Sequence, residues 1–149
     1  MPEKETLERA KQDKREGKAP STQAGEFVKE EIEHIREGKH GARSAKQAIA
    51  IGLSKARRAG VNLPPPEKGK ASRKTRQQAA RDLRKGLSSS KSKTSAKRSR
   101  ASTKALKREG RSAASKTALS RHATKAASKR SKAERSRSAR KAARTRKKS

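Results

Sequence analysis

Carboxylate and imidazole side chains that could bind a metal fall close together in one part of this sequence. Glu30, His34 and Glu37 share one face of a predicted helix, and His40 follows closely. Such groups can share a zinc or iron ion. However, the sequence has no paired HExxH-like motif of the kind that marks a metal-binding helix. We therefore expect the glutamates to solvate the outer face of the helix with His34 among them, and we predict no metal site.

Other catalytic groups are missing or lack a supporting pattern. The chain has no cysteine, which excludes disulfides, thiolate metal sites and cysteine nucleophiles. No spacing of its three histidines and many serines supports a serine–histidine–acid triad, and no glycine-rich phosphate loop is present. We predict that the protein is not an enzyme and has no catalytic residues and no cofactor.

Lysine and arginine dominate the chemistry of the chain. They make up 45 of its 149 residues against 14 aspartates and glutamates, which gives a formal net charge of +31. From residue 64 onward there are 31 bases and four acids. Such a charge favours anionic partners, namely nucleic acid, polyphosphate or acidic lipid. The residues that we expect to contact nucleic acid are Lys55, Arg57, Arg58, Arg73, Lys74, Arg76, Arg81, Arg84, Lys85, Lys104, Lys107, Arg108, Lys125, Lys129, Arg130, Arg140, Lys141 and Arg144.

The near absence of aromatic residues narrows the kind of nucleic acid. The sequence has no tryptophan, no tyrosine and one phenylalanine, Phe27, which belongs to a predicted apolar face. Proteins that bind single strands stack bases on aromatic side chains, whereas contacts to phosphates carry no base information. We therefore predict binding without sequence preference, with duplex DNA preferred and RNA possible. The expected protein is histone-like, cytoplasmic and nucleoid-associated.

Two alternatives stay open. In the first, the protein is an RNA- or ribosome-associated adaptor whose N-terminal hairpin binds a protein partner, while the basic tail tethers it to RNA. In the second, it binds polyphosphate or a membrane surface, which we favour less because the tail lacks bulky apolar residues to insert into an interface. We expect no membrane span and no signal peptide, since no apolar run is long enough for the first and the initial residues lack the apolar core of the second.

Residues 44–66 hold the densest apolar run, and signals at both ends predict a helix there. Ser44 and Gln47 have the spacing of a capping box. Gly60 can end the helix, and the three prolines after it prevent its resumption. The aliphatic residues also alternate as in a strand, but the two end signals and the alanine content favour a helix. The residues expected on its buried face are Ala45, Ile49, Leu53 and Ala56.

A second amphipathic helix is predicted just before this one. Ser21 or Thr22 can cap it, and it should run to about Glu37 and end at Gly38. Its apolar stripe consists of Phe27, Val28, Ile32 and Ile35. Because the link between the two helices is short and glycine-rich, we expect a helical hairpin in which the two stripes pack together. A unit this small leaves apolar surface uncovered, which also makes a homodimer plausible.

The string KQAIAIGLSKARRAG at residues 46–60 resembles the signature of a family of small basic bacterial proteins of unknown function. Members carry a KQAIAIALSEAR-like segment, sometimes with a lysine- and alanine-rich extension. This sequence departs from that pattern at Gly52, where alanine is common, and at Lys55, where an acid is common. The resemblance implies a bacterial origin and no particular activity, because the family has no established chemistry. The basic tail is similar in composition to linker histones and bacterial histone-like proteins.

Large apolar residues are scarce, with 14 leucines, isoleucines, valines and phenylalanines among 149 residues. A highly charged chain in which these residues make up less than about 20% is usually disordered. We therefore predict a mostly α-helical protein with extensive disorder, built from a small helical hairpin and a long basic tail of low complexity with nascent helix. The predicted segments are a polar, charge-balanced N-terminal segment (1–20), the hairpin (21–63), a proline-rich hinge (64–70), a basic helix (71–87) and a disordered histone-like tail (88–149).

Overall fold

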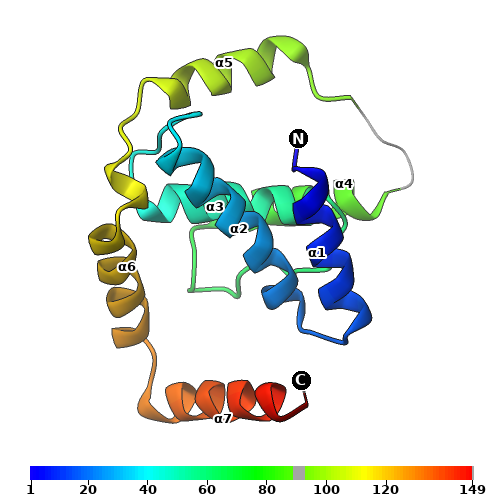
Figure 1. Ribbon diagram of the computed structural model, residues 1–149, viewed down its shortest axis with the longest axis vertical. Helices are drawn as coiled ribbons and strands as arrows, with labels where there is room; N and C mark the ends of the chain where they lie inside the picture. The colour runs from blue at the N-terminus through cyan, green and yellow to red at the C-terminus, as the bar shows by residue number, and fades with distance from the viewer. Residues whose placement is uncertain (89–92, 149) are drawn as a thin grey trace.

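The computed structural model describes residues 1–88 and 93–148, and within them the chain forms seven α-helices and one 3-10 turn (Figure 1). Helices α1 to α4 span Lys4–Arg15, Pro20–Arg36, Ala45–Arg58 and Arg73–Leu87. Helix α5 spans Ala96–Lys107, the turn η1 Ser112–Ala114, helix α6 Lys116–Ser128 and helix α7 Lys132–Lys148. No helix in these two ranges combines the length and the apolar character that a bilayer span requires.

Helices α1 to α4 form a bundle, and the remaining helices run around it. In the bundle, α3 packs against both α2 and α4, and α1 packs against α2. Helices α5, α6 and α7 follow one another along the outside, at the top, the left and the bottom of Figure 1. The turn η1 contacts α2, α3 and α6, and α6 contacts α3. The basic tail is therefore attached to the bundle at η1 and the start of α6.

The ends of the hairpin helices follow the local signals in the sequence. The hydroxyl oxygen of Ser44 accepts a hydrogen bond from the backbone N–H of Gln47 at 3.2 Å and so caps α3. The Gln47 side chain in turn accepts from the backbone N–H of Arg43 at 2.7 Å. Gly38 and Gly60 follow α2 and α3 with φ angles of +79° and +96°. These left-handed conformations end both helices at the predicted glycines.

Helix α2 begins earlier than predicted, because its first residue precedes both predicted cap residues. Pro20 is its first residue, and Ala19 occupies the N-cap position in place of Ser21 or Thr22. Proline suits the first turn because its φ angle is already helical and the missing N–H would have had no partner within the helix.

Apart from Arg57, the residues on the buried face of α3 are small, and the isoleucines are not among them. Its buried residues are Ala45, Ala48, Gly52, Ala56 and Arg57. Ile49 and Ile51 are only half-buried. A Cβ atom at Gly52 would lie 2.6 Å from the Cα of Val28 on α2, so no side chain fits at this contact. The buried face therefore differs from the predicted one and lies on the alanines and Gly52. Small side chains at the contact allow the axes of α2 and α3 to lie closer together.

One apolar cluster joins α1, α2 and α3 around Phe27, which is 1% exposed. Its other members are Ala10, Ala24, Ala56 and Val61, with Leu7, Leu53 and Leu63 partly buried beside them. An ion pair between Arg9 Nε and Glu26 Oε2 at 2.7 Å also connects α1 to α2. The polar N-terminal segment thus contributes both apolar and charged contacts to the bundle.

A second apolar cluster includes residues of the basic tail. Its members are Ile32, Ile35, Ala42, Ala48, Ala113 and Ala114, with Val28 and Leu119 partly buried. The prediction of extensive disorder is wrong: residues 93–148 of the predicted disordered tail are helical over most of their length, and residues 89–92 and 149 lie outside the described structure. The count of large apolar residues misled because it leaves out alanine, and alanine fills a close-packed core where backbones come near one another.

Backbone contacts also attach the last turn of α5 and the segment after it to the turn after α2. The N–H of Gly41 donates to the carbonyl of Leu106 at 2.9 Å, and the N–H of Ala42 donates to the carbonyl of Gly110 at 3.1 Å. A Cβ atom at Gly41 would lie 2.0 Å from the carbonyl oxygen of Glu109. Only glycine allows this close approach, which holds the tail against the hairpin. The two segments are far apart in the sequence, so no local pattern predicts the contact.

Candidate nucleic-acid interface

Three of the predicted nucleic-acid contacts, Lys55, Arg57 and Arg58, lie on α3 and are engaged within the bundle. Arg57 is 7% exposed and donates hydrogen bonds from Nε to the carbonyl of Leu63 at 3.1 Å and from Nη2 to the carbonyl of Pro64 at 3.2 Å. Burial lowers the pKa of its guanidinium group below the ordinary value. Arg57 therefore holds the chain where it leaves α3 and presents little of its charge to solvent.

Arg58 belongs to a network of hydrogen bonds around Asp82 of α4, which is 1% exposed. One carboxylate oxygen of Asp82 accepts from Arg58 Nε at 2.8 Å and from Gln78 Nε2 at 3.1 Å. The other oxygen accepts from the hydroxyl of Ser54 at 2.7 Å. This network joins α3 to α4 and removes the single acidic residue of α4 from the protein surface.

Buried charge is divided unequally between acids and bases. Within the described residues the buried acids are Asp13, Glu30, Glu31 and Asp82, and the one buried base is Arg57. Lys55, for example, pairs through Nζ with the buried carboxylate of Glu31 while remaining partly exposed itself. Because acids are withdrawn in preference to bases, the surface is more basic than the composition alone indicates.

Helix α4 presents most of its cations to solvent. The exposed ones are Arg73, Lys74, Arg81, Arg84 and Lys85. Arg76 is half-buried and donates from Nε to the carbonyl of Pro66 at 3.1 Å. Ala79 and Asp82 face the bundle. The outer side of α4 is therefore a basic surface supported by its packing on α3.

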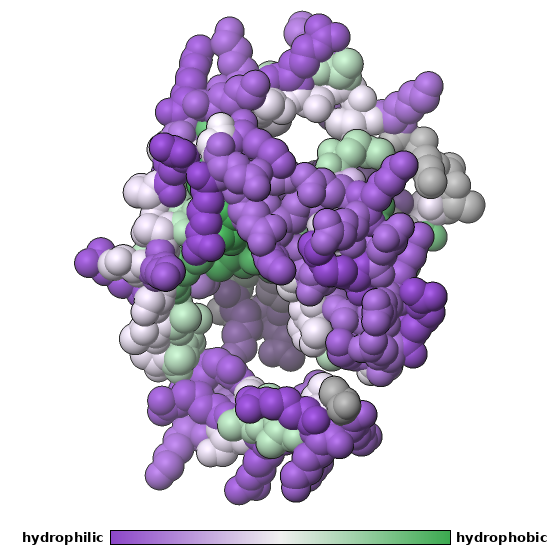
Figure 2. Space-filling model, in the orientation of Figure 1, coloured by the Kyte–Doolittle hydropathy of each residue, from purple (hydrophilic) through white to green (hydrophobic). Residues whose placement is uncertain are grey.

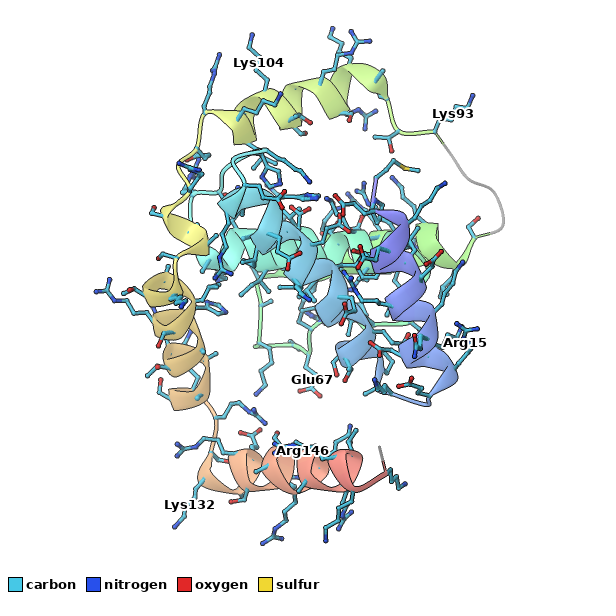
Figure 3. All side chains as sticks on the ribbon, viewed as in Figure 1. Arg15, Glu67, Lys93, Lys104, Lys132 and Arg146 are labelled. Atoms are coloured by element: carbon cyan, nitrogen blue, oxygen red, sulfur yellow. The ribbon has the colours of Figure 1, made fainter. Side chains whose placement is uncertain are left out.

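The predicted contacts in the basic tail are all exposed, at Lys104, Lys107, Arg108, Lys125, Lys129, Arg130, Arg140, Lys141 and Arg144. Helices α5, α6 and α7 bury none of their residues. Hydrophilic side chains project from α5 and α7 between paler patches in Figure 2, and Lys104 and Lys132 point away from the bundle in Figure 3. Since α5 and α7 lie on opposite sides of the bundle, these cations spread over an extended surface and do not gather in one site.

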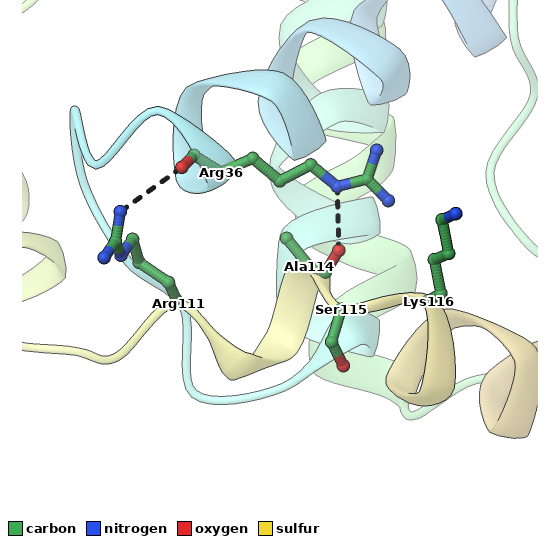
Figure 4. A pocket seen from close by; sticks show the side chains of 5 residues that line it. All are labelled: Arg36, Arg111, Ala114, Ser115 and Lys116. Carbon is green, nitrogen blue, oxygen red and sulfur yellow. Dashed lines mark hydrogen bonds between the residues drawn. The ribbon is translucent and has the colours of Figure 1, made fainter.

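A pocket that the sequence did not indicate lies where the tail meets α2 (Figure 4), lined by Arg36, Arg111, Ala114, Ser115 and Lys116. Arg36 Nε donates to the carbonyl of Ala114 at 3.0 Å, and Arg111 Nη1 donates to the carbonyl of Arg36 at 3.4 Å. The hydroxyl oxygen of Ser115 caps α6 by accepting from the N–H of Ala118 at 3.1 Å. In Figure 4 the charged ends of Arg36 and Lys116 lie on one side of this pocket and that of Arg111 lies on the other. Cations beside a helix N-terminus suit an anion such as phosphate.

This pocket was missed because Arg36 and Arg111 are 75 positions apart in the chain. In a sequence with 45 lysines and arginines, no local pattern distinguishes these two from the others. The one local signal was Ser115, a good N-cap residue at the start of an alanine-rich helix.

One group of side chains within the described residues could hold a metal ion, and it consists of Glu31, His34 and His40. The sequence pattern pointed instead to Glu30 and Glu37 as the carboxylates near His34. The difference arises because the turn after α2 brings His40 back beside Glu31, and a helical face calculated for α2 alone does not include that turn.

A family model matches residues 5–68, and its description is a family of unknown function (DUF6496). The matched range contains most of α1, all of α2 and α3, and part of the proline-rich link, and it covers less than half of the 149 residues. No curated protein and no solved structure matches the chain. The chain is thus similar to an uncharacterised family over its first three helices.

Proposed function

We propose that the protein binds duplex DNA without sequence preference, through contacts between phosphates and the exposed lysines and arginines of α4 to α7. The observation that carries this proposal is the unequal burial of charge, with four acids and one base buried among the described residues. Each cation that meets a phosphate releases a condensed counterion, which favours binding at low salt. A surface with this excess of cations also attracts a polyanion over a distance.

Helices α5, α6 and α7 suit a partner outside the chain. Because α5 and α7 bury none of their residues, packing within the protein contributes little to their stability, whereas α6 is held to the bundle where it begins. Helix α7 carries nine bases and one acid, and pairs such as Arg140 and Arg144 place like charges one turn apart. Phosphates lying between such pairs would remove the repulsion. Binding to DNA and helix formation would therefore reinforce each other.

The pocket at Arg36, Arg111 and Lys116 offers one fixed phosphate contact within this extended surface. The hydrogen bonds of Arg36 and Arg111 to backbone carbonyls already orient their guanidinium groups. A group that is ordered before binding loses less conformational freedom when a phosphate arrives. This pocket would position the bundle on the DNA while the outer helices follow the backbone.

The proposed setting is the nucleoid of a bacterial cell. With Phe27 buried in the bundle, none of the aromatic side chains that stack on single-stranded bases is available at the surface. The contacts that remain are to phosphates, which a duplex carries at a higher density along its axis than a single strand. A comparison with structured RNA separates the DNA proposal from an RNA-associated role.

The test is a titration of the full chain with unrelated DNA duplexes and with a structured RNA over a range of salt concentrations. We expect equal affinity for all duplexes and a log–log salt slope of about 0.9 per phosphate contact. Replacing Arg140, Lys141 and Arg144 by glutamine should reduce that slope by up to about 2.7, since three exposed contacts are lost.

A matched variant controls for net charge. Lys4, Lys11 and Lys14 are exposed on α1, and their replacement by glutamine removes the same charge from a helix that is not part of the proposed surface. We expect its salt slope to equal that of the unmodified protein. Equal losses in the two variants would show that net charge alone governs binding, and tighter binding to the RNA at every salt concentration would assign the surface to RNA.

A further inference from the structure

We propose that Glu31, His34 and His40 bind a divalent metal ion, with Zn²⁺ as the preferred ion. Glu31 and His34 lie about one turn apart near the C-terminal end of α2, and His40 lies in the turn that follows. One ligand atom from each residue lies within 4.8 Å of the other two. The site shares no residue with the proposed DNA contacts, so either proposal can fail without the other.

The distances between the ligand atoms are close to those of a tetrahedral site. His40 Nε2 lies 3.2 Å from Glu31 Oε2, and His34 Nδ1 lies 3.8 Å from Glu31 Oε1. Zinc bonds of about 2.0–2.1 Å at tetrahedral angles place ligand atoms about 3.3 Å apart. The pair of His40 and Glu31 already has this separation, and side-chain rotations can bring His34 into place.

Glu31 supplies a buried oxygen that has no hydrogen-bond donor. Its side chain is 0% exposed, and Oε2 accepts no hydrogen bond from the described residues. A buried carboxylate oxygen without a donor is unfavourable, and native proteins seldom leave one in this state. Nε2 of His40 lies 3.2 Å from this oxygen, close to the separation of two ligand atoms that share a tetrahedral zinc ion.

A ring nitrogen of His40 lies close to this oxygen. His40 Nδ1 lies 3.0 Å from the carbonyl oxygen of Gly41, which can only accept a hydrogen bond, so Nδ1 carries the proton. Nε2, the other ring nitrogen, lies 3.2 Å from Glu31 Oε2, but the two atoms form no hydrogen bond. A metal ion bound to both atoms would give the buried oxygen a partner and would occupy the second ring nitrogen of His40.

His34 is oriented in the same manner by Glu3. Its Nε2 makes a hydrogen bond of 2.9 Å with Glu3 Oε1, which leaves Nδ1 as the atom that faces Glu31. Lys39 Nζ holds the same carboxylate oxygen at 3.2 Å. Metal-binding histidines commonly donate their second ring N–H to a carboxylate or a backbone carbonyl. Both histidines have such a partner here, in Glu3 and in the carbonyl of Gly41.

The charges around the site also suit a divalent cation. Lys55 Nζ pairs with Oε1 of Glu31 and lies 3.7 Å from Oε1 of Glu30, so it leaves Oε2 of Glu31 free for a metal. Two buried carboxylates face this single ammonium group, and the surplus negative charge attracts a cation.

The set of ligands indicates the class of metal and a route of entry. Two imidazoles and one carboxylate favour Zn²⁺ and related transition metals over Mg²⁺ or Ca²⁺, which prefer oxygen ligands. Three protein ligands leave one position for water. His40 also lines a surface pocket together with Lys107 and Glu109, and an ion could reach the site through this opening. A bound ion would join α2 to the turn that holds the tail.

The test uses Co²⁺ as a spectroscopic probe on the full chain, followed by displacement with Zn²⁺. We expect visible absorption bands typical of tetrahedral Co²⁺, which one equivalent of Zn²⁺ should abolish. His34→Gln and His40→Gln should each weaken Zn²⁺ binding at least tenfold. Glu3→Gln, which changes a positioning residue with a half-exposed side chain, should weaken it by about 10–100-fold.

His122→Gln on α6 is the matched control, and it should leave Zn²⁺ affinity unchanged. Nitrogen-15 NMR spectra of the imidazole rings should show Nδ1 protonated in metal-free His40, and Zn²⁺ should shift His40 Nε2 and His34 Nδ1. The proposal is overturned if the protein at neutral pH binds no stoichiometric Zn²⁺, or if the site variants bind Zn²⁺ as tightly as the control. A His40 ring that is protonated on both nitrogens and does not respond to Zn²⁺ would also overturn it.

Discussion

Gly86 of α4 lies against the carbonyl oxygen of Arg57 on α3, so closely that a Cβ atom at Gly86 would be 1.8 Å from that oxygen. The backbone nitrogen of Gly60 would be 3.1 Å from the same Cβ. This contact lies at the C-terminal ends of both helices, one turn beyond the buried Asp82. It makes the basic helix α4 a part of the bundle.

Gly86→Ala should destabilise the protein by about 1–3 kcal/mol, because the new methyl group meets backbone that cannot rotate away. In a helix without this contact, alanine in place of glycine would stabilise the protein by about 1 kcal/mol. A loss of stability would therefore indicate the close contact. Urea denaturation followed by circular dichroism measures it. Gly25→Ala on α2 is the control, since nothing lies within 4 Å of its Cβ position, and it should stabilise the protein. Stabilisation by both substitutions would contradict the close contact.

The two sides of the Arg58–Asp82 pair should respond differently to truncation. Asp82→Ala removes the acceptor of three hydrogen bonds from the centre of a buried network and should cost about 2–4 kcal/mol. Arg58→Ala should cost about 1 kcal/mol or less, because Asp82 keeps Ser54 and Gln78 and the Arg58 side chain is 44% exposed. A double-mutant cycle by urea denaturation checks this, and equal costs for the two single variants would disagree with the network.

Gly41→Ala should release the segment after α5 from the hairpin. The added Cβ atom would lie 2.0 Å from the carbonyl of Glu109, so the hydrogen bonds from Gly41 and Ala42 to this segment cannot form unchanged. Amide hydrogen exchange at Ala42 should become at least tenfold faster. Gly110→Ala has nothing within 4 Å of its Cβ position and serves as the control. Unchanged protection at Ala42 in the Gly41 variant would show that the tail does not depend on this contact.

The first turn of α7 should lose stability in acid. The N–H of Ser131 donates to Glu134 Oε2 at 2.8 Å, and the N–H of Glu134 donates to the Ser131 hydroxyl at 3.2 Å. The Ser131 hydrogen bond, followed by the charge of Lys70, lowers the pKa of Glu134 below its ordinary value. The cap therefore stabilises α7 above the unfolded pKa of about 4.3, and this contribution is lost as the pH falls through the lower, folded pKa.

NMR spectra of residues 131–135 from pH 7 to acid should follow this loss of the cap. Glu134→Gln is the control, because glutamine keeps the capping box but cannot titrate, so the same signals should become independent of pH. A Glu134 carboxyl that titrates at or above the ordinary glutamate range would contradict the cap.

Much of the hairpin could be predicted because its signals are local. The cap at Ser44 and the ends at Gly38 and Gly60 depend only on residues within one or two turns. Apolar spacing also identified Phe27 and Ile35, which are 1% and 0% exposed. These features need no knowledge of where the rest of the chain lies.

The core contacts of the tail could not be predicted in this way. Ala113 and Ala114 are 4% and 1% exposed, but nothing in a run of alanine, serine and lysine distinguishes buried alanines from exposed ones. Gly52 likewise reads as a weak point in a helix, whereas its place against Val28 on α2 is what permits the close packing. Each of these contacts depends on a partner that is distant in the chain.

By itself, the sequence determined the helical segments of the hairpin, the positions where they end and the large excess of positive charge. These properties follow from composition and from interactions between neighbouring residues. Only the tertiary structure decided that Arg57 is buried while most cations of α4 to α7 stay exposed, and that Glu31 meets His40. Those outcomes depend on contacts between separate segments, because the burial and the partners of a side chain are set by the elements that pack against it.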